Sequence, residues 1–156
     1  MNVDSPLLVA LVVISVLTGA ASGGVYLAFS AMVLPALRTG DASEAVRVMQ
    51  RVNVAAMRPA FMLVFFGAGL AGIGLVIAEA MLTGAVSPLR GVGAALLDAS
   101  VLLTILVNVP RNNALAAADA SPASWRAFDR VWSPANAVRG WLSTLGAAAI
   151  VGSLFV

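Results

Sequence analysis

The 156-residue chain contains no cysteine and no histidine, and all nine of its basic residues are arginine. The absence of cysteine excludes disulfides, thiolate nucleophiles and Cys-ligated metals. The absence of histidine removes the usual general base near neutral pH and a common ligand of haem and zinc. The sequence also has no phosphate loop, no catalytic triad and no metal-ligand spacing. We therefore expect neither a metal nor another cofactor.

Charge is also scarce. Only 10% of the residues are charged and 61% are hydrophobic, whereas soluble domains are about a quarter charged and about half apolar. The natural solvent of such a chain is a bilayer, and its length suits a single domain, residues 1–156. The net charge is +2, but the arginines are scattered near expected helix ends rather than along a stripe. We expect membrane lipids as partners and no nucleic acid.

Seven prolines divide the sequence, and four of them follow a serine: Ser5-Pro6, Ser87-Pro88, Ser121-Pro122 and Ser133-Pro134. Serine caps the first turn of a helix and proline suits its first position, so each pair predicts a helix start. A membrane span needs roughly 20 mostly apolar residues. The sequence therefore predicts an all-α integral membrane four-helix bundle, with spans at about residues 6–37, 59–81, 88–113 and 134–155.

Two shorter segments, residues 42–57 and 122–131, are amphipathic. In the first, Asp41 and Glu44 have the spacing of a capping box, and arginines occupy one face of the helix while alanine, valine and methionine occupy the other. The second mixes aromatic side chains with charged ones. Helices of this kind lie in the membrane interface, so we expect two interfacial helices.

The first span is expected to stay in the mature protein. No basic residue precedes its apolar run, and the run continues through residues 25–34, unlike that of a signal peptide. Within it, Gly19 and Gly23 form a small-xxx-small pair, which lets another helix approach closely. A homo-oligomer is one arrangement that this spacing permits.

The distribution of arginine predicts the topology. The connections between the first two and the last two spans carry eight arginines, and the opposite side carries only Arg90. Short cytoplasmic loops are enriched in arginine. We therefore expect a multi-pass protein of the cell membrane with both arginine-rich connections in the cytoplasm and both termini outside.

Amides and arginines gather at the expected cytoplasmic ends of the helices. Because residues three and four apart share a helix face, Asn108, Arg111 and Asn112 should lie together on one helix, and Asn136 and Arg139 on another. The candidate binding residues at this level are Asn53, Arg58, Asn108, Arg111, Asn112, Trp132, Asn136 and Arg139. They predict a polar pocket open to the cytoplasmic leaflet. The alternative is structural, because such side chains also snorkel, cap helices and join them.

Asp98 falls near the middle of the third span, where a carboxylate costs about 2.5–3.5 kcal/mol even on insertion scales. Counted at about 100° per residue, Asp98 lies within about 80° of Asn108. It is therefore a candidate catalytic group at the deep end of the same cavity, or a protonated acid bonded to a hydroxyl such as Ser15. Glu79 is expected to be solvated at the interface. Tyr26 is a candidate cavity wall, with plain packing as the alternative.

Two helix ends and one helix start have a recognisable pattern. Residues 29–37 read FSAMVLPAL, residues 107–115 read VNVPRNNAL, and Trp132 precedes an Asn136-x-x-Arg139 element. In order and spacing over nearly the whole chain, this pattern resembles the anthrone oxygenase-like family. The Asn-Val-Pro-x-Asn-x-x-Leu element is its most specific part.

The resemblance implies a four-helix membrane protein that oxidises a lipophilic aromatic or phenolic substrate with O₂, without metal or flavin. It implies that Asn108, Asn112, Asn136 and Arg139 stabilise an enolate oxygen, as an oxyanion hole does, beside Trp132 as a stacking wall. Relatives often carry Trp-Asn-His-x-Arg where this chain has Ala135 and Ala137. The usual base is therefore missing, and Asp98 or Asp129 would have to replace it.

Two other functions stay open. The missing histidine and the Gly/Ala-rich helix faces also suit a non-catalytic protein that binds a lipid or a small hydrophobic ligand, or that is a subunit of a membrane complex. A transporter is less well supported, because Asp98 is the only charge expected at mid-membrane.

Overall fold

A computed structural model describes residues 5–156, and every regular element within them is a helix. Residues 1–4 of the expected domain lie outside the described part. The elements, with η for a π-helical turn, are α1 Pro6–Ala28, η1 Phe29–Val33, α2 Leu34–Thr39, α3 Ala42–Ala56, α4 Pro59–Thr83, α5 Pro88–Leu103, η2 Thr104–Asn108, α6 Val109–Ala116 and α7 Pro122–Gly152. The all-α class expected from the sequence is confirmed.

Three of the helical segments are long and apolar enough to cross a membrane. They are α1–η1–α2 as one run, Pro6–Thr39, then α4, and then α5–η2–α6, Pro88–Ala116. Their outward faces carry large apolar side chains, such as Leu63, Leu70 and Ile77 on α4. Acyl chains suit such a surface and water does not. The molecule is a membrane protein, and its first three expected spans correspond to these helices.

A proline follows each π-helical turn by two residues, and this spacing has a physical cause. Proline lacks an N–H and its ring clashes with the carbonyl four residues back. Before Pro35, the Leu34 N–H bonds the Phe29 carbonyl, and before Pro110, the Val109 N–H bonds the Thr104 carbonyl. These bonds reach five residues back, so the widened turn accommodates the proline and the helix continues.

The predicted break before the last span is wrong. Residues 122–131 and 134–155 do not form separate helices, because α7 runs unbroken from Pro122 to Gly152 with Pro134 inside it. Ser133 does not cap a new helix but donates a 2.5 Å hydrogen bond to Asp129. Phe128 and Trp132 stack across the expected break, with ring centroids 5.2 Å apart. Burial of these rings outweighs the local preference for a helix start.

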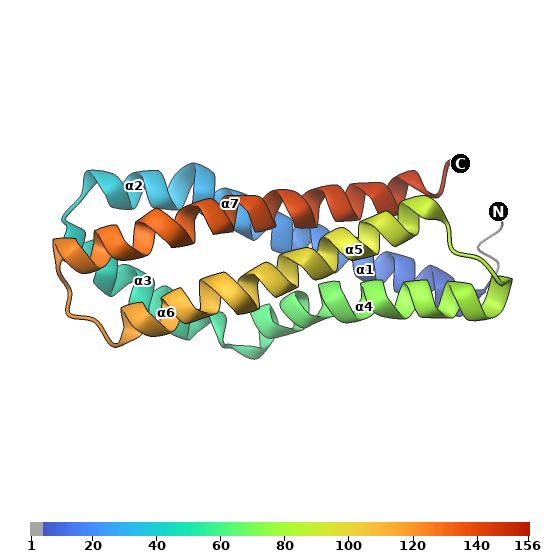
Figure 1. The fold of residues 1–156 in the computed structure, drawn as a ribbon, viewed down its shortest axis with the longest axis horizontal. Coiled ribbons are helices and arrows are strands. Elements are labelled where there is room, and N and C mark those ends of the chain that lie inside the picture. Colours follow the sequence, from blue (N-terminus) through green and yellow to red (C-terminus); the bar gives the residue numbers. More distant parts are fainter. Residues whose placement is uncertain (1–4) are drawn as a thin grey trace.

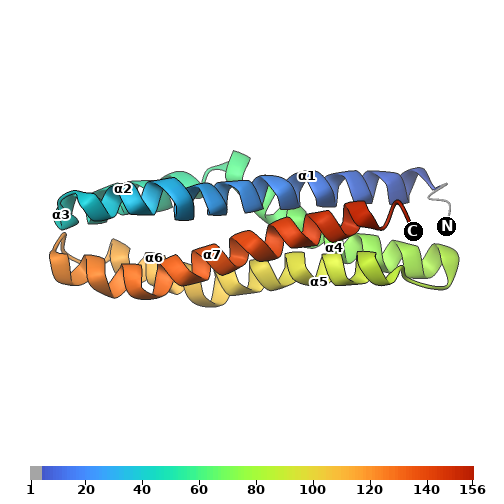
Figure 2. The same ribbon diagram turned by 90° about the horizontal axis from the view of Figure 1, so that it is seen from above.

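The other predicted interfacial helix, α3, is also placed differently. Its capping residue is as expected, since Asp41 accepts a 2.8 Å bond from the Glu44 N–H. However, α3 does not lie across the ends of the other helices. It runs back alongside α2, along the long axis of the molecule (Figures 1 and 2). Its apolar face packs in a protein cluster with α2, α6 and α7 rather than on lipid: Leu34, Ala45, Val46, Met49, Leu115, Trp125, Phe128 and Trp132.

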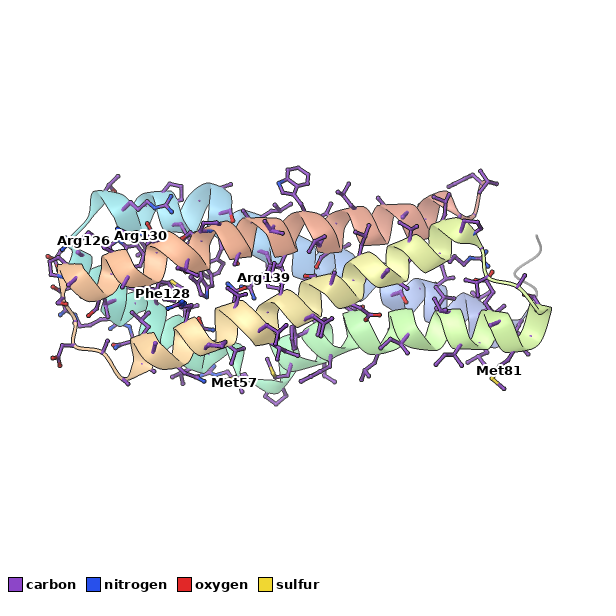
Figure 3. All side chains as sticks on the ribbon, viewed as in Figure 1. Met57, Met81, Arg126, Phe128, Arg130 and Arg139 are labelled. Carbon is purple, nitrogen blue, oxygen red and sulfur yellow. The ribbon has the colours of Figure 1, made fainter. Side chains whose placement is uncertain are left out.

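The connections between the helices lie at two opposite ends of the molecule. The α2–α3 and α6–α7 connections lie at one end, and the α4–α5 turn and the end of α7 lie at the other (Figure 1). Arg126 and Arg130 are near the first end, and Met81 is near the second (Figure 3). The two arginine-rich connections therefore share one end, as the sequence predicted.

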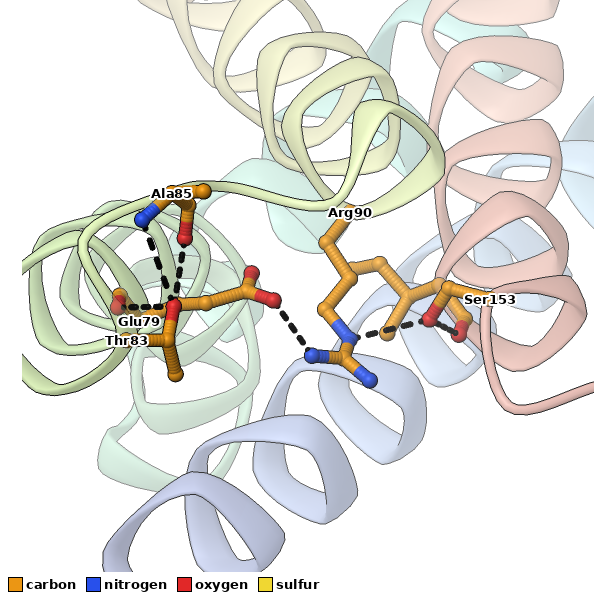
Figure 4. A network of polar contacts seen from close by, with 6 residues as sticks. Glu79, Thr83, Ala85, Arg90 and Ser153 are labelled. Atoms are coloured by element: carbon orange, nitrogen blue, oxygen red, sulfur yellow. Dashed lines mark hydrogen bonds and ion pairs between the residues drawn. The ribbon is translucent and has the colours of Figure 1, made fainter. Parts of the chain in front are cut away.

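Glu79 is not solvated, contrary to expectation. It is 0% exposed and accepts a 2.5 Å bond from Arg90 Nη1, which is itself 2% exposed. Arg90 Nε also donates to Ser153 Oγ at 3.1 Å, so the network joins α4, α5 and the end of α7 (Figure 4). A buried carboxylate and a buried guanidinium neutralise one another here, and each needs the other.

Replacing Glu79 with alanine should lower the free energy of unfolding by about 3–5 kcal/mol, because Arg90 would stay buried without a partner. Thermal unfolding of the purified protein in detergent measures this loss. The Glu79→Met/Arg90→Met double variant should recover most of it.

The control is Glu44→Gln at neutral pH, where hydrogen bonds from Arg47 and Arg51 lower the pKa of Glu44 and keep it ionised. Because those pairs are exposed, the control should change stability little. Equal losses for both glutamates would contradict the assigned role.

Adjacent glycines on α1 show how closely α1 and α7 pack. A β-carbon on Gly23 would lie 3.0 Å from the backbone nitrogen of Thr144 and 3.2 Å from the carbonyl oxygen of Gly140. A β-carbon on Gly24 would meet nothing within 4 Å. Only the absence of a side chain at Gly23 lets the two backbones approach, as its small-xxx-small spacing predicted.

The Gly23→Ala variant should therefore lose about 1–3 kcal/mol of stability through overpacking. The Gly24→Ala variant should be neutral or slightly more stable, since alanine favours a helix by about 1 kcal/mol over glycine. Thermal unfolding of the two variants in the same detergent compares neighbouring positions of one helix. A Gly23→Ala protein as stable as Gly24→Ala would show that the α1–α7 contact is loose.

Candidate functional site

A cavity of about 440 Å³ lies among α1, α3, α4, η2, α6 and α7. Most of its wall is apolar, and half a dozen aromatic rings contribute to it: Tyr26, Phe29, Phe61, Phe65, Phe66 and Trp132. The polar side chains in the wall are Asn53, Thr104, Asn112, Asn136 and Arg139. A site of this size and composition suits a flat, mostly apolar molecule with a few oxygen atoms.

One face of α7 forms the polar side of the cavity. Trp132, Asn136, Arg139 and Ser143 recur at spacings of four, three and four residues, so they share a face. All four are buried. Arg139 is only 7% exposed and lies near the middle of the molecule rather than at its arginine-rich end (Figure 3). A cation is therefore held deep among helices.

Neutral groups hold the Arg139 guanidinium in place. Its Nε and Nη2 both donate to Asn136 Oδ1, at 3.2 and 2.7 Å, and its Nη1 donates to Thr104 Oγ1 at 3.2 Å. The guanidinium carbon also lies 3.9 Å from the centroid of the Tyr26 ring and 5.2 Å from that of Trp132. Aromatic faces attract cations, so the two rings offset part of the cost of burial.

Asn136 connects this cation to α1. Its Nδ2 donates to the Tyr26 carbonyl at 2.7 Å and to Ser30 Oγ at 2.9 Å, while its Oδ1 accepts both bonds from Arg139. The amide thus uses both of its donors and its acceptor. It fixes the helices and the guanidinium at once, which makes it a positioning residue.

Arg139 has no carboxylate partner within residues 5–156. The ion pairs within residues 5–156 involve four other arginines, namely Arg38, Arg47, Arg51 and Arg90. A guanidinium has five N–H donors, and the contacts of Arg139 account for three of them. The remaining two make no hydrogen bond within residues 5–156. The arrangement is an incomplete charge site that faces an apolar, aromatic space.

A second group of polar atoms lies in the wall without a partner. Asn53 Nδ2, Asn112 Oδ1 and Trp132 Nε1 are buried and make no hydrogen bond within the described chain. Buried polar atoms are normally paired. Two donors and one acceptor in the wall are therefore left without a partner in the described chain.

The structure brings five of the candidate residues to the cavity: Asn53, Asn112, Trp132, Asn136 and Arg139. Asn108 is fully buried beside it but outside its wall, where its Nδ2 donates to the Trp132 carbonyl at 3.3 Å. Asn108 therefore supports the stacking wall from behind.

Asp98 does not line the cavity. Its Oδ1 lies 3.2 Å from the place of a β-carbon on Gly69, so it faces α4. The straight-helix count toward Asn108 does not hold across η2, because the wide turn takes up about one extra residue and so reduces the rotation by about 100°. Asp98 and Asn108 consequently point in nearly opposite directions.

The two remaining candidates also lie elsewhere. Arg111 is exposed and lines a separate groove with Leu106, Pro110 and Val131. Arg58 is exposed at the start of α4 and lies outside the wall of the cavity. Arg58 directly follows Met57, which lies near the middle of the molecule at the level of Arg139 (Figure 3). The sequence pattern alone does not separate such surface residues from cavity residues.

Sequence reasoning missed Thr104, and it left Tyr26 open between packing and cavity. A signal for Thr104 existed, since Pro110 requires a disturbance in the preceding turn and the observed one includes Thr104. For Tyr26 no local signal exists, because its role depends on a cation 113 positions later in the chain.

These features define a helical membrane protein with an aromatic cavity and a buried, unpaired arginine. The family model of the anthrone oxygenases matches residues 56–149, from the last residue of α3 to near the end of α7. The chain therefore belongs to the anthrone oxygenase family, as its sequence pattern suggested. Searches of the curated proteins and of the solved structures found no match. Helix α1, which precedes the matched segment, contributes Tyr26 to the cavity.

The Asn136→Ala variant should lose at least about 1–3 kcal/mol of stability, because the Arg139 guanidinium would lose its acceptor and the Tyr26 carbonyl its donor. Thermal unfolding in detergent measures this, with Asn113→Ala as control, since Asn113 is exposed on α6. If Asn136→Ala unfolds at the same temperature as the control, Asn136 does not hold α1 and α7 together.

Proposed function

We propose that the protein binds a planar, lipophilic aromatic ketone or phenol in the cavity and oxidises it with O₂, as a cofactor-independent oxygenase. The observation that supports this most is the buried Arg139 in the wall of an aromatic cavity. Within residues 5–156, two of its N–H groups make no hydrogen bond and it has no carboxylate partner. Such donors stabilise negative charge on oxygen where water is excluded. Membership of the anthrone oxygenase family supports the reaction class.

The membrane placement is part of the proposal. We take α7 as the fourth span of a four-helix bundle, with the arginine-rich end in the cytoplasm of the cell and the end of α7 outside. Arg139 lies 13 residues before Gly152, or about 20 Å at 1.5 Å per residue. Within a hydrocarbon layer about 30 Å thick, the cavity then faces the cytoplasmic leaflet, where a lipophilic substrate collects.

Access from the leaflet would be between α4 and the α5–η2–α6 helix. Wall residues on both sides of this gap are partly exposed: Met57 and Phe66 on one side, Ile105 and Val109 on the other. Their apolar side chains suit passage of an aromatic molecule from lipid. Asn53 and Asn112 would then meet a second oxygen of the substrate.

The chemistry would begin from the enolate or phenolate of the substrate, with its oxygen on Arg139. One electron passes from this anion to O₂, which gives a carbon radical and superoxide. The two combine into a peroxide at the activated carbon, and loss of water leaves a new carbonyl. Overall, a CH₂ group and O₂ become C=O and H₂O. Arg139 would stabilise the anion, Asn136 would position Arg139, and Tyr26 and Trp132 would enclose the reacting ring.

A non-catalytic binding protein is the second candidate function. It is favoured by one observation, that the described residues of the cavity wall include no carboxylate and no histidine. Such a protein would hold a hydrophobic ligand through the same contacts. Measurement of oxygen consumption separates it from the oxygenase.

Oxygen uptake with 1,8-dihydroxyanthrone is the direct test, in lipid nanodiscs and corrected for autoxidation in empty nanodiscs. We expect wild-type protein to consume one O₂ per anthraquinone formed. Arg139→Gln should lower kcat/KM by about 10²–10³-fold, the typical effect of losing an oxyanion donor. Arg130→Gln, which changes an exposed arginine of the same helix, should leave it unchanged.

Both variants are checked for a single folded species by size-exclusion chromatography. Oxygen uptake that is equal in wild type and a folded Arg139→Gln variant would refute the role of Arg139. The stable product 1,8-dihydroxyanthraquinone tests binding without turnover. If it quenches the tryptophan fluorescence of the wild-type protein but the protein consumes no oxygen with the anthrone, the binding function holds instead.

A further inference from the structure

We infer that the cavity takes its ligand as the conjugate base, as a phenolate or enolate that has lost its proton before it binds. The inference rests on the proposed function only for the ligand class, an aromatic oxygen acid. It requires no oxidation, so it also holds for a binding protein. Its basis is the charge balance of the cavity.

Arg139 carries a positive charge that no carboxylate of the described chain neutralises. An arginine side chain stays protonated in proteins, and an unpaired charge in an apolar interior is costly. The faces of Tyr26 and Trp132 reduce that cost, but they do not accept the two remaining N–H groups in the plane of the guanidinium. A ligand oxygen that carries a negative charge completes the site, because charge-assisted bonds are about twice as strong as neutral ones.

The side chains around Arg139 offer few groups that could take a proton from a ligand. Around Arg139, η2 presents Thr104, α4 presents only phenylalanine and methionine side chains, and the α3 and α6 sides present Asn53 and Asn112. From α1, Tyr26 is the one other titratable group in the wall.

The nearest acids on the packed elements have other partners or directions. Asp98 on α5 faces Gly69, and Asp129 on α7 binds Arg38 and Ser133. No residue among those described in the wall is a carboxylate or an imidazole that would take a proton from the ligand. The proton must therefore leave earlier, to water near the arginine-rich end.

The surplus of arginine over acidic residues attracts anions to the cavity. Counting Arg139, the arginine-rich half of the molecule holds eight arginines and four acids, namely Asp41, Glu44, Asp119 and Asp129. A surplus of four positive charges raises the local concentration of anions. A delocalised aromatic anion is both attracted by this field and compatible with the apolar wall.

The probe for this inference is 7-hydroxycoumarin, a flat phenol that ionises near neutral pH and whose phenol and phenolate absorb at different wavelengths. Titration into wild-type protein in nanodiscs under argon should shift the spectrum toward the phenolate. The apparent pKa of the bound probe should fall below that of the free probe. The ether 7-methoxycoumarin, which has no proton to lose, should bind about 10–100-fold more weakly, the range for loss of one charge-assisted bond.

The variants locate the effect. Arg139→Gln should abolish the spectral shift and bind both coumarins equally, and Arg139→Lys, which keeps the charge, should retain part of the shift. Arg130→Gln should match wild type. Binding of the neutral phenol, equal affinity for the two coumarins in wild type, or no saturable binding of 7-hydroxycoumarin would each overturn the inference. This titration is done without oxygen and therefore tests binding alone. A protein that binds the phenolate here but consumes no oxygen in the anthrone assay refutes only the oxidation.

Discussion

The arrangement of the helices around the cavity depends on one buried cation. Arg139 is held by an amide on its own helix and by a hydroxyl from η2, and it lies against a ring from α1. Asn136 extends the same set of contacts to the α1 backbone. Three helical segments far apart in the chain are therefore ordered by the need to satisfy a single guanidinium. At the other end of the molecule, Arg90 is paired with the carboxylate of Glu79 and also bonds Ser153. The two arginines therefore differ in their surroundings, since Arg90 meets a carboxylate and Arg139 meets only neutral groups within the described chain.

Much of the fold followed from composition and periodicity. Apolar runs, serine-proline pairs and the capping box predicted the helices correctly where local preference and burial agree. They failed at Pro134, where Phe128 and Trp132 pack across the expected break, and at α3, whose apolar face meets protein and not lipid. Both failures have the same physical reason. The partners that cover an amphipathic face are distant in sequence, and helix periodicity does not distinguish a protein partner from a lipid.

The candidate site was predictable in part. The spacing of Asn136 and Arg139 placed them on one face, and the family pattern added Trp132. The structure brings all three to one cavity. Asn108 and Asp98 were assigned to the same space by counting along an ideal helix, which the turn at η2 invalidates. Tyr26 could not be assigned, because its contact with Arg139 exists only once α1 and α7 have packed. Glu79 was misjudged for the same reason, since its partner Arg90 becomes a neighbour only after α4 and α5 fold back on one another.

The π-helical turn η2 has a consequence for the identity of the cavity wall. In an uninterrupted α-helix, Thr104 and Asn112 would differ by about 80° in direction, since eight residues turn through about 800°. The extra residue in the wide turn cancels that offset, so both side chains face the cavity. Pro110 thus sets the rotational phase of the whole of α6. If this turn became an ordinary α-helical turn with no residue removed, α6 would rotate by about 100° and present a neighbour of Asn112 to the cavity, with every side chain of the site unchanged.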